Sequence, residues 1–530
     1  MGTSSTHSGK QRTISVGILT APQVEFVLRG QSLLAAAEGG KVVINGEARE
    51  EWYFQPQSFF TLKNVKIGKG FHWERYQEQS FPGDLKLIAR DGCVIAINVV
   101  GIEDYLQCVI ASEMSPTAGF EFLKAHAVIS RSWLLAQLDK RDEVREGYSS
   151  VECNTPTELI RWQDREDHEW FDFCADDHCQ RYQGIPQAVI PSEVEGSQAS
   201  VNLAMIRKTK RVIEATWGQV LWYDGRVCDA RFSKCCGGAL EEFKYCWENK
   251  EVPYLKYARD YAPASCVGWL NASGSIAAAG AQMDLREEKS ARKWILGSPR
   301  AFCNTRSKRL LGQVLKDYDS ETEDFYRWKV EYTADELRQI ILERTGDDYG
   351  EILDLIPLER GVSGRICRLK IVGSKKTRII GKELEIRKTL SRSHLYSSAF
   401  VVEKVYGPEP SGGKVCDATH QHKEKSAAEQ SFSAAAEGQP ANFVLTGAGW
   451  GHGVGLCQIG AAAMGARGYD YHAILQHYYP NSTLKTIQPH DDSEAANGHF
   501  VSTKPAFSEE IMPQDDFGRT NRHLVAKKKE

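Results

Sequence analysis

The hydrophobic period of the chain changes at about residue 101, and this change limits the folds that it can adopt. From Thr13 to about Val100, short apolar runs such as ISVGIL, KVVING and CVIAINVV alternate with Gly and Asn, which is typical of strands joined by tight turns. After Gly101 the apolar residues recur at helical spacing, which predicts two helices joined by the segment SEMSPTAG. The sequence therefore predicts a mixed α+β protein with a β-rich N-terminal module and a helical catalytic segment.

The rest of the chain predicts a second, inserted module. A helix near TADELRQIILERTG and strands in GRICRLKIVGS, TRIIG and AFVVEKVYG indicate mixed α/β structure. The run AVIPSEVEGSQASVNLA is predicted to be a surface loop, with strands returning after Lys208 and a hairpin turn at Gly225. Stretches poor in large apolar residues are predicted to be disordered. The predicted boundaries are 1–12 (disordered), 13–100 (β-rich), 101–264 (catalytic segment with a Cys/His loop), 265–407 (inserted module), 408–440 (flexible insertion), 441–485 (glycine-rich turn and helix completing the catalytic module) and 486–530 (disordered tail).

Composition and charge exclude two classes of partner. The 530 residues carry 66 Lys and Arg against 70 Asp and Glu, so no global positive field attracts nucleic acid. No stretch approaches the roughly 18 consecutive apolar residues that a membrane-spanning helix needs. The chain is therefore expected to bind no nucleic acid and to contain no membrane-spanning segment.

Glu113 is the first candidate for chemistry, because it lies at the predicted junction of the two helices. A carboxylate at such a junction can be partly withdrawn from water, which raises its pKa and suits it to donate a proton near neutral pH. Spacing alone favours the alternative, an exposed carboxylate at a helix end.

Three motifs resemble the family of stage II sporulation protein D and the amidase enhancers. YLQCVIASEMSP followed by LKAHAVISRSWLL is similar to the family pattern YLxGVVxxEMP and LKAQAVAARTYAL, with Ser115 and His126 as departures. The segment GAGWGHGVGLCQIG and its continuation to HYYPNSTL are similar to the glycine-rich element that closes the family pattern. ARFSKCCGG is similar to a family segment with the hydroxyl-rich run HSTS, but here Cys235 and Cys236 replace two of its residues.

The resemblance implies a fold with a substrate groove and a set of site residues. Glu113 would be the catalytic acid and base. The predicted substrate-binding residues are Lys124, Arg131, Trp450, His452 and Gln458. The glycine-rich turn is expected to pack against the Glu113 helices, where Trp450 either stacks on a sugar ring or anchors the core.

A loop after the helices contains the ligand types of a metal site. His168, Cys174, His178 and Cys179 together offer two thiolates and two imidazoles, the set of a closed tetrahedral zinc site. Some members of the resembled family bind zinc through a comparable cluster. The alternatives are a solvated polar loop with scattered ligand types and a site in which Cys153 replaces one ligand. The sequence leaves open whether Cys235 and Cys236 are thiols or form disulfides with other partners.

The resemblance implies a lytic transglycosylase that cuts peptide-free peptidoglycan strands between N-acetylmuramic acid and N-acetylglucosamine and leaves a 1,6-anhydro end. The rival is a non-catalytic, glycan-binding activator of a cell-wall amidase, and a zinc hydrolase is disfavoured because four protein ligands leave no position for water. The substrate implies the cell envelope, yet Met1–Ser15 does not resemble a signal peptide. A trimmed chain, a misassigned start codon and an intracellular protein all stay open.

Overall fold

The chain forms two compact units, each assembled from segments that are far apart in the sequence. The computed structural model describes residues 12–56, 58–68, 75–115, 117–144, 150–162, 168–176, 179–185, 196–261, 283–315, 324–406 and 440–487. Unit 1 comprises Met1–Lys140, Arg165–Asp229 and Thr483–Glu530, and unit 2 comprises Arg141–Asp164 and Ala230–Ser482. The predicted disordered and flexible segments lie outside the described residues, apart from residues 12, 440, 486 and 487.

The described residues of unit 1 form three sheets. Their strand orders are β5-β4-β3-β2-β7-β8, β13-β1-β10-β9-β6 and β15-β14-β24. In the second sheet β1 pairs antiparallel with β10, from Thr13 opposite Gly101 to Ala21 opposite Val94. The strands of unit 1 are β1 (Thr13–Ala21), β2 (Gln23–Leu28), β3 (Gln31–Glu38), β4 (Lys41–Ile44), β5 (Glu47–Arg49), β6 (Glu51–Phe54), β7 (Phe59–Ile67), β8 (Arg75–Pro82), β9 (Asp84–Arg90), β10 (Cys93–Gly101), β13 (Phe173–Cys174), β14 (Gln219–Tyr223), β15 (Arg226–Val227) and β24 (Thr483–Thr486).

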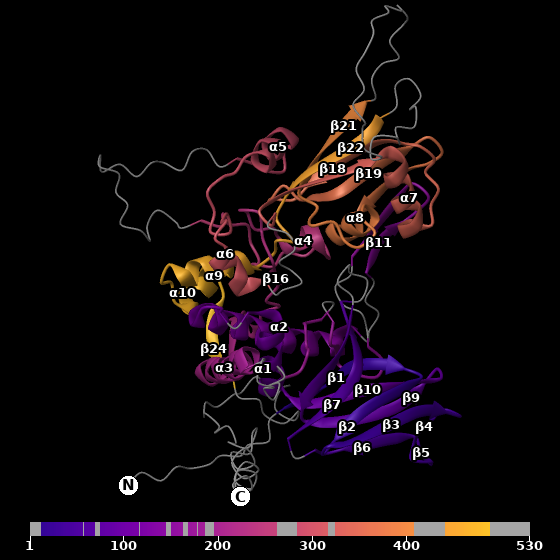
Figure 1. Cartoon of the computed structure of the whole chain (residues 1–530). Coiled ribbons are helices and arrows are strands. Elements are labelled where there is room, and N and C mark those ends of the chain that lie inside the picture. Colours follow the sequence, from indigo (N-terminus) through magenta and orange to yellow (C-terminus); the bar gives the residue numbers. More distant parts are fainter. Residues whose placement is uncertain are drawn as a thin grey trace, which may run out of the picture. The chain divides into compact units, whose positions relative to one another are not determined.

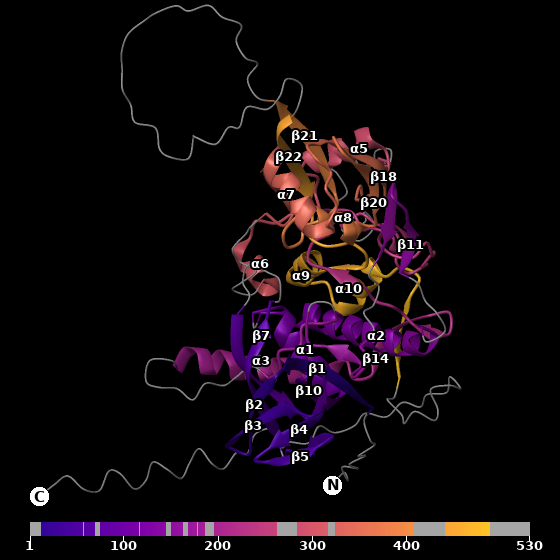
Figure 2. The same cartoon turned by 90° about the vertical axis from the view of Figure 1, so that its right-hand side faces the viewer.

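Three helices lie together beside β1 and β10 in unit 1 (Figures 1 and 2). They are α1 (Ile102–Glu113), α2 (Phe120–Val144) and α3 (Gly196–Ala215). α1 follows β10 without a loop and packs against both β10 and α3. The two predicted helices on either side of SEMSPTAG are therefore confirmed, and so is the β-rich N-terminal region.

The prediction of a loop and strands around residues 188–215 is wrong. Residues 196–215 form α3, and only the stretch before residue 196 lies outside the described residues. Met205, Thr209 and Val212 are buried at helical spacing, and Ile213 is buried beside them. This period was hidden by the many small and polar residues of the segment, because they weaken the apolar signal from which helices are predicted. The predicted hairpin at Gly225 is confirmed by the pairing of β14 with β15.

Unit 2 is also mixed α and β. Its sheets have the orders β11-β12-β20-β19-β18, β17-β22-β21 and β16-β23. Its strands are β11 (Val151–Asn154), β12 (Glu158–Arg161), β16 (Phe232–Ser233), β17 (Arg327–Thr333), β18 (Ile352–Arg360), β19 (Ile366–Gly373), β20 (Thr377–Gly381), β21 (Phe400–Tyr406), β22 (Pro440–Ala448) and β23 (Leu456–Cys457). Its helices are α4 (Phe243–Cys246), α5 (Glu288–Leu296), α6 (Lys308–Val314), α7 (Ala334–Thr345), α8 (Glu383–Thr389), α9 (Gln458–Ala466) and α10 (Tyr471–Tyr478).

One hydrophobic core joins α7 and α8 to the larger sheets of unit 2 (Figure 1). Leu337 and Ile341 of α7 and Ile386 of α8 are buried in it together with strand residues such as Leu369 and Leu445. The predicted helix near TADELRQIILERTG is α7, and its N-cap Thr333 accepts a hydrogen bond from the backbone N–H of Glu336. Across the helices that the structure describes, none is long and apolar enough to cross a membrane.

Candidate active site

Glu113 is the last residue of α1 in unit 1. The backbone N–H of Met114 still donates to the carbonyl of Ile110 (3.1 Å), but Met114 itself is extended at φ −118° and ψ 154°, so the helix ends there. The side chain of Glu113 is only 7% exposed. It is therefore a buried carboxylate, and the exposed alternative considered from spacing is wrong.

The segment 179–185 runs along the end of α1 and is hydrogen-bonded to its last two residues. The backbone N–H of Arg181 donates to Oε1 of Glu113 (3.3 Å), and that of Gln183 donates to Oγ of Ser112 (2.9 Å). Between them, the hydroxyl of Tyr182 donates to Oδ1 of Asn98 on β10 (2.6 Å). The segment is thus fixed to both β10 and α1, and it supplies a backbone hydrogen bond to the candidate acid.

The predicted Cys/His cluster lies immediately before this segment. The ligand atoms of His168, Cys174 and Cys179 all lie within 4.8 Å of one another, and Sγ of Cys179 is 3.5 Å from Nε2 of His168. Cys174 is held by β13, which pairs parallel with β1 at Gly17. His178 lies outside the described residues. Three of the four predicted ligands therefore lie close enough together to bind one metal ion.

Tyr105 of α1 connects the cluster to the acid. Burial raises the pKa of its phenol well above the ordinary value, and the charges of Cys179, Cys174 and Glu113 raise it further. Its hydroxyl therefore stays protonated and donates to Oε1 of Gln180 (3.2 Å), while its ring stacks on Tyr182 at a centroid distance of 4.8 Å. The cluster and Glu113 thus lie around one buried tyrosine within unit 1.

The two predicted substrate-binding residues of α2 already have protein partners. Lys124 forms an ion pair with Glu121 (2.6 Å). Arg131 is 1% exposed, and its guanidinium makes two hydrogen bonds to Glu103 (2.8 and 2.5 Å) and one to the carbonyl of Gln219 (2.9 Å). This buried bidentate pair ties α2 to α1 and β14 and explains Arg131 without a substrate. Substrate binding by either residue stays a prediction.

Trp450, His452 and Gln458 lie in unit 2. Trp450 stacks on Phe325 at a centroid distance of 4.7 Å, and Gln458, the first residue of α9, is 2% exposed. His452 packs edge-on against Trp247, and its Nδ1 accepts a hydrogen bond from the backbone of Val454 (3.0 Å). Burial and then the nearby charges of arginine side chains lower the pKa of His452 well below its ordinary value, so the ring is neutral at neutral pH. Because these residues and Glu113 belong to different units, their expected juxtaposition and the groove stay predictions.

The glycines around His452 allow close internal packing. A Cβ on Gly453 would lie 2.4 Å from the guanidinium carbon of Arg365, and one on Gly455 would lie 2.0 Å from the carbonyl oxygen of Arg231. Both glycines have positive φ, at 75° and 69°, which a side chain would strain. The conformation of this segment is therefore required by the core of unit 2.

The structure also brings together a group of side chains that the sequence analysis missed. Cys236, Asp260, Cys303 and Cys457 are all buried in unit 2, and their ligand atoms lie within 4.8 Å of one another, close enough to bind a metal ion. Cys235 and Cys236, whose state was left open, form no disulfide in the described part of the chain. The adjacent Cys235 and Cys236 were a signal of such a group in the sequence. The two other cysteines, Cys303 and Cys457, are 67 and 221 positions from Cys236 along the chain.

Two family models match separate parts of the chain. Residues 90–223, which contain Glu113 and the Cys/His cluster, match the family model described as stage II sporulation protein. Residues 241–416 match a domain of unknown function (DUF8618). The resemblance of the sequence motifs to stage II sporulation protein D and the amidase enhancers is thus supported by a family model over residues 90–223 and by the likeness to an amidase enhancer.

Two curated relatives show how far the likeness extends. The chain is 24% identical over 279 residues to the amidase enhancer of Bacillus subtilis (strain 168), a match that covers 52% of this chain. It spans only 32% of the length of that relative. It is also 21% identical over 441 residues to an uncharacterized protein of Brachyspira hyodysenteriae (strain ATCC 49526 / WA1), with 83% of this chain and 78% of the relative covered.

Proposed function

We propose that the protein acts in the bacterial cell wall as a peptidoglycan lytic transglycosylase. The observation that carries this proposal is the burial of Glu113 at the end of α1, with a backbone N–H donor from the segment 179–185. Burial penalises a carboxylate more than a protonated carboxyl, while the N–H group stabilises the carboxylate once it forms. These opposing effects suit a group that must first give and then take a proton.

In the proposed reaction Glu113 acts alone. Its proton goes to the glycosidic oxygen between N-acetylmuramic acid and N-acetylglucosamine as the bond from that oxygen to C1 breaks. The 6-hydroxyl of the muramic acid then attacks C1, and the Glu113 carboxylate accepts the hydroxyl proton. The products are a free N-acetylglucosamine end and a 1,6-anhydro end, without uptake of water.

We further propose that His168, Cys174, His178 and Cys179 bind one zinc ion with a structural role. The donor set fits, because two thiolates and two imidazoles complete a tetrahedral site and the three described ligands lie within 4.8 Å of one another. Such an ion supplies folding energy when bound. Cys179 is the first residue of the segment 179–185 that contacts Glu113, so a bound ion would help to orient the backbone donor of Arg181.

The proposed substrate-binding residues are His452 and Gln458, which would orient the glycan, and Trp450, which would stack on a sugar ring. Lys124 and Arg131 of α2 are the other two proposed substrate-binding residues. Peptide-free glycan strands are the proposed substrate, and a cell-wall amidase is a proposed partner. We propose the cell envelope as its location, because the proposed substrate lies there, and fractionation of cells would test this.

Glu113→Gln tests the proposed enzyme. It keeps the shape of the side chain and removes the exchangeable proton, so the release of anhydro ends from peptide-free strands should fall by about 10²- to 10⁴-fold while glycan binding persists. Mass spectrometry of the products gives the readout. Glu214→Gln, the same change at an exposed position of α3, is the control and should retain turnover. Anhydro-end release by Glu113→Gln at the unmodified rate would refute the proposal.

The alternative is a glycan-binding activator of an amidase, and the likeness to the amidase enhancer of Bacillus subtilis favours it. An activator would release no anhydro ends itself. It would raise the rate of a separate amidase on intact peptidoglycan, and Glu113→Gln would leave that effect unchanged.

A further inference from the structure

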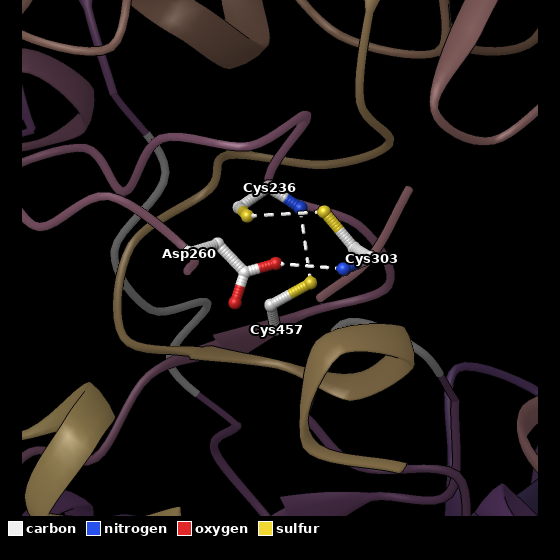
Figure 3. Close-up of side chains that lie close together, drawn as sticks. All are labelled: Cys236, Asp260, Cys303 and Cys457. Atoms are coloured by element: carbon white, nitrogen blue, oxygen red, sulfur yellow. Dashed lines mark hydrogen bonds between the residues drawn. The ribbon is translucent and has the colours of Figure 1, made fainter. Parts of the chain in front are cut away.

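The group of Cys236, Asp260, Cys303 and Cys457 joins four segments of unit 2. Figure 3 shows the three sulfur atoms and the carboxylate directed toward a common point. Cys236 follows β16, Cys303 precedes α6, and Cys457 ends β23 at the N-cap of α9. Asp260 is 0% exposed, and the three cysteines are 2%, 1% and 0% exposed. This group is therefore part of the core and comes from positions spread over more than two hundred residues.

Backbone N–H groups point at sulfur atoms of this group, as they do at sulfur ligands of bound metal ions. Sγ of Cys457 accepts hydrogen bonds from the backbone N–H groups of Cys236 (3.3 Å) and Gly460 (3.4 Å), the second of them at the N-terminus of α9. Sγ of Cys236 accepts one from Gly238 (3.4 Å). N–H donors and a helix N-terminus stabilise negative charge on sulfur, which a neutral buried thiol would not require.

The carboxylate of Asp260 is oriented in the same way. The backbone N–H of Cys303 donates to its Oδ2 (2.9 Å), and the hydroxyl of Tyr478 donates to its Oδ1 (2.7 Å). A carboxylate offers about four lone-pair positions, so two donors leave room for a metal. Hydrogen bonds of this kind hold a ligating side chain in one orientation.

We propose that Cys236, Cys303, Cys457 and Asp260 bind one structural Zn²⁺ ion, separate from the Cys/His cluster of unit 1.

The spacing of the ligands selects zinc over the other occupants of a cysteine site. Tetrahedral Zn–S bonds of about 2.3 Å place sulfur atoms about 3.8 Å apart. Sγ of Cys236 is 3.6 Å from Sγ of Cys303. An iron–sulfur cluster would hold cysteines that bind different iron atoms farther apart than this group, in which all four ligand atoms lie within 4.8 Å of one another. A disulfide would need a separation of about 2.05 Å and would use only two of the three thiols.

Four protein ligands fill a tetrahedral site, so this ion would be structural and would leave no position for water. It would also fix the glycine-rich segment. Cys457 lies at the end of that segment, and Cys235, the neighbour of Cys236, exchanges two backbone hydrogen bonds with Trp450 (3.1 and 2.7 Å). The ion would thus hold both sides of the segment that carries His452.

The test must separate this site from the proposed zinc of unit 1. Full-length protein with the double change Cys174→Ser and Cys179→Ser lacks two ligands of the Cys/His cluster. Purified without chelators, it should still contain about one equivalent of zinc by elemental analysis. X-ray absorption at the zinc edge should show three sulfur neighbours and one oxygen. Failure of the unit 1 site alone would leave these results unchanged.

Adding Cys303→Ser to this protein should lower its zinc content at least about tenfold. Cys367→Ser is the matched control, because Cys367 is a buried free cysteine of the same unit that lies outside the group, and it should retain the ion. If Cys303→Ser does not fold, the absorption spectrum of the double variant decides the ligand set. A Cys236–Cys303 disulfide in alkylated peptides, a metal-free double variant after incubation with zinc, or full zinc content in Cys303→Ser would each overturn the proposal.

Discussion

The two units each gather cysteines into a group, but they do so in opposite ways. In unit 1, Cys179 and His168 are eleven positions apart on one loop, and every described ligand is partly exposed. In unit 2, Cys457 and Cys236 are 221 positions apart, and every ligand is buried. A local cluster shapes one loop, whereas a dispersed cluster joins buried segments that are far apart in the sequence. The loss of each should therefore have a different consequence.

The largest expected difference is in stability. Cys303→Ser should lower the midpoint of thermal unfolding by roughly 5 to 10 °C, because it disconnects buried segments, and Cys174→Ser should lower it by about half as much or less. Differential scanning calorimetry of full-length protein measures both. Equal shifts, or a larger shift for Cys174→Ser, would remove the distinction between a loop-fixing and a core-joining cluster.

The same contrast predicts an order of metal loss. Since the unit 1 ligands are partly exposed, a chelator such as EDTA should remove zinc from His168, Cys174 and Cys179 before it reaches the buried group. A two-phase release is expected, with the slow phase at least about tenfold slower. The variant that lacks Cys174 and Cys179 should retain only the slow phase. A single fast phase in that variant would contradict the order.

A smaller effect on stability and turnover is expected from the contact between the segment 179–185 and the end of α1 beside Glu113. Ser112→Ala leaves the N–H of Gln183 without its acceptor and should cost about 1 to 2 kcal/mol of stability. Turnover should fall severalfold with little change in KM, because the loop beside Glu113 loosens.

Ser132→Ala is the matched control for Ser112→Ala. Ser132 makes the same pair of bonds on α2, donating to Val128 (2.7 Å) and accepting from Leu221 (2.8 Å), away from the loop. It should lose similar stability and keep its turnover. Parallel losses of turnover in both variants would mean that the contact near Glu113 has no special role.

A pH dependence of stability is expected from a buried acid of unit 2. Burial raises the pKa of Glu241 from 4.5 to about 7, although Ser363 and the N–H of Glu242 donate hydrogen bonds to it. The folded state therefore binds its proton more tightly than the unfolded state does. Its contribution to stability is fully present below about pH 4.5 and is lost as the pH rises through about 7. Denaturant unfolding between these values should show this slope, and Glu241→Gln should flatten it.

Sequence alone predicted what depends on neighbours along the chain. The strands before Gly101, the two helices around Glu113 and three ligands of the local cluster follow from periodicity, turn residues and a motif. The burial of Glu113 could not be predicted, because it depends on the segment 179–185 folding back onto α1. Nor could the group around Cys236, since no spacing relates Cys303 to Cys457. The whole of α3 was missed, because its many small and polar residues fit both a loop and a helix and weaken the helical signal.

The last described strand has a practical consequence for dissecting the protein. β24 pairs antiparallel with β14, with Thr486 opposite Gln219 and Thr483 opposite Trp222. Gly218 makes room for this return, because a Cβ there would lie 2.2 Å from the carbonyl oxygen of Ile487. A fragment that stops at Asp229 therefore keeps the acid and the local cluster but exposes the unpaired edge of β14, a site for aggregation. A short peptide with the sequence of residues 481–487, added in trans, would be the natural complement for such a split protein.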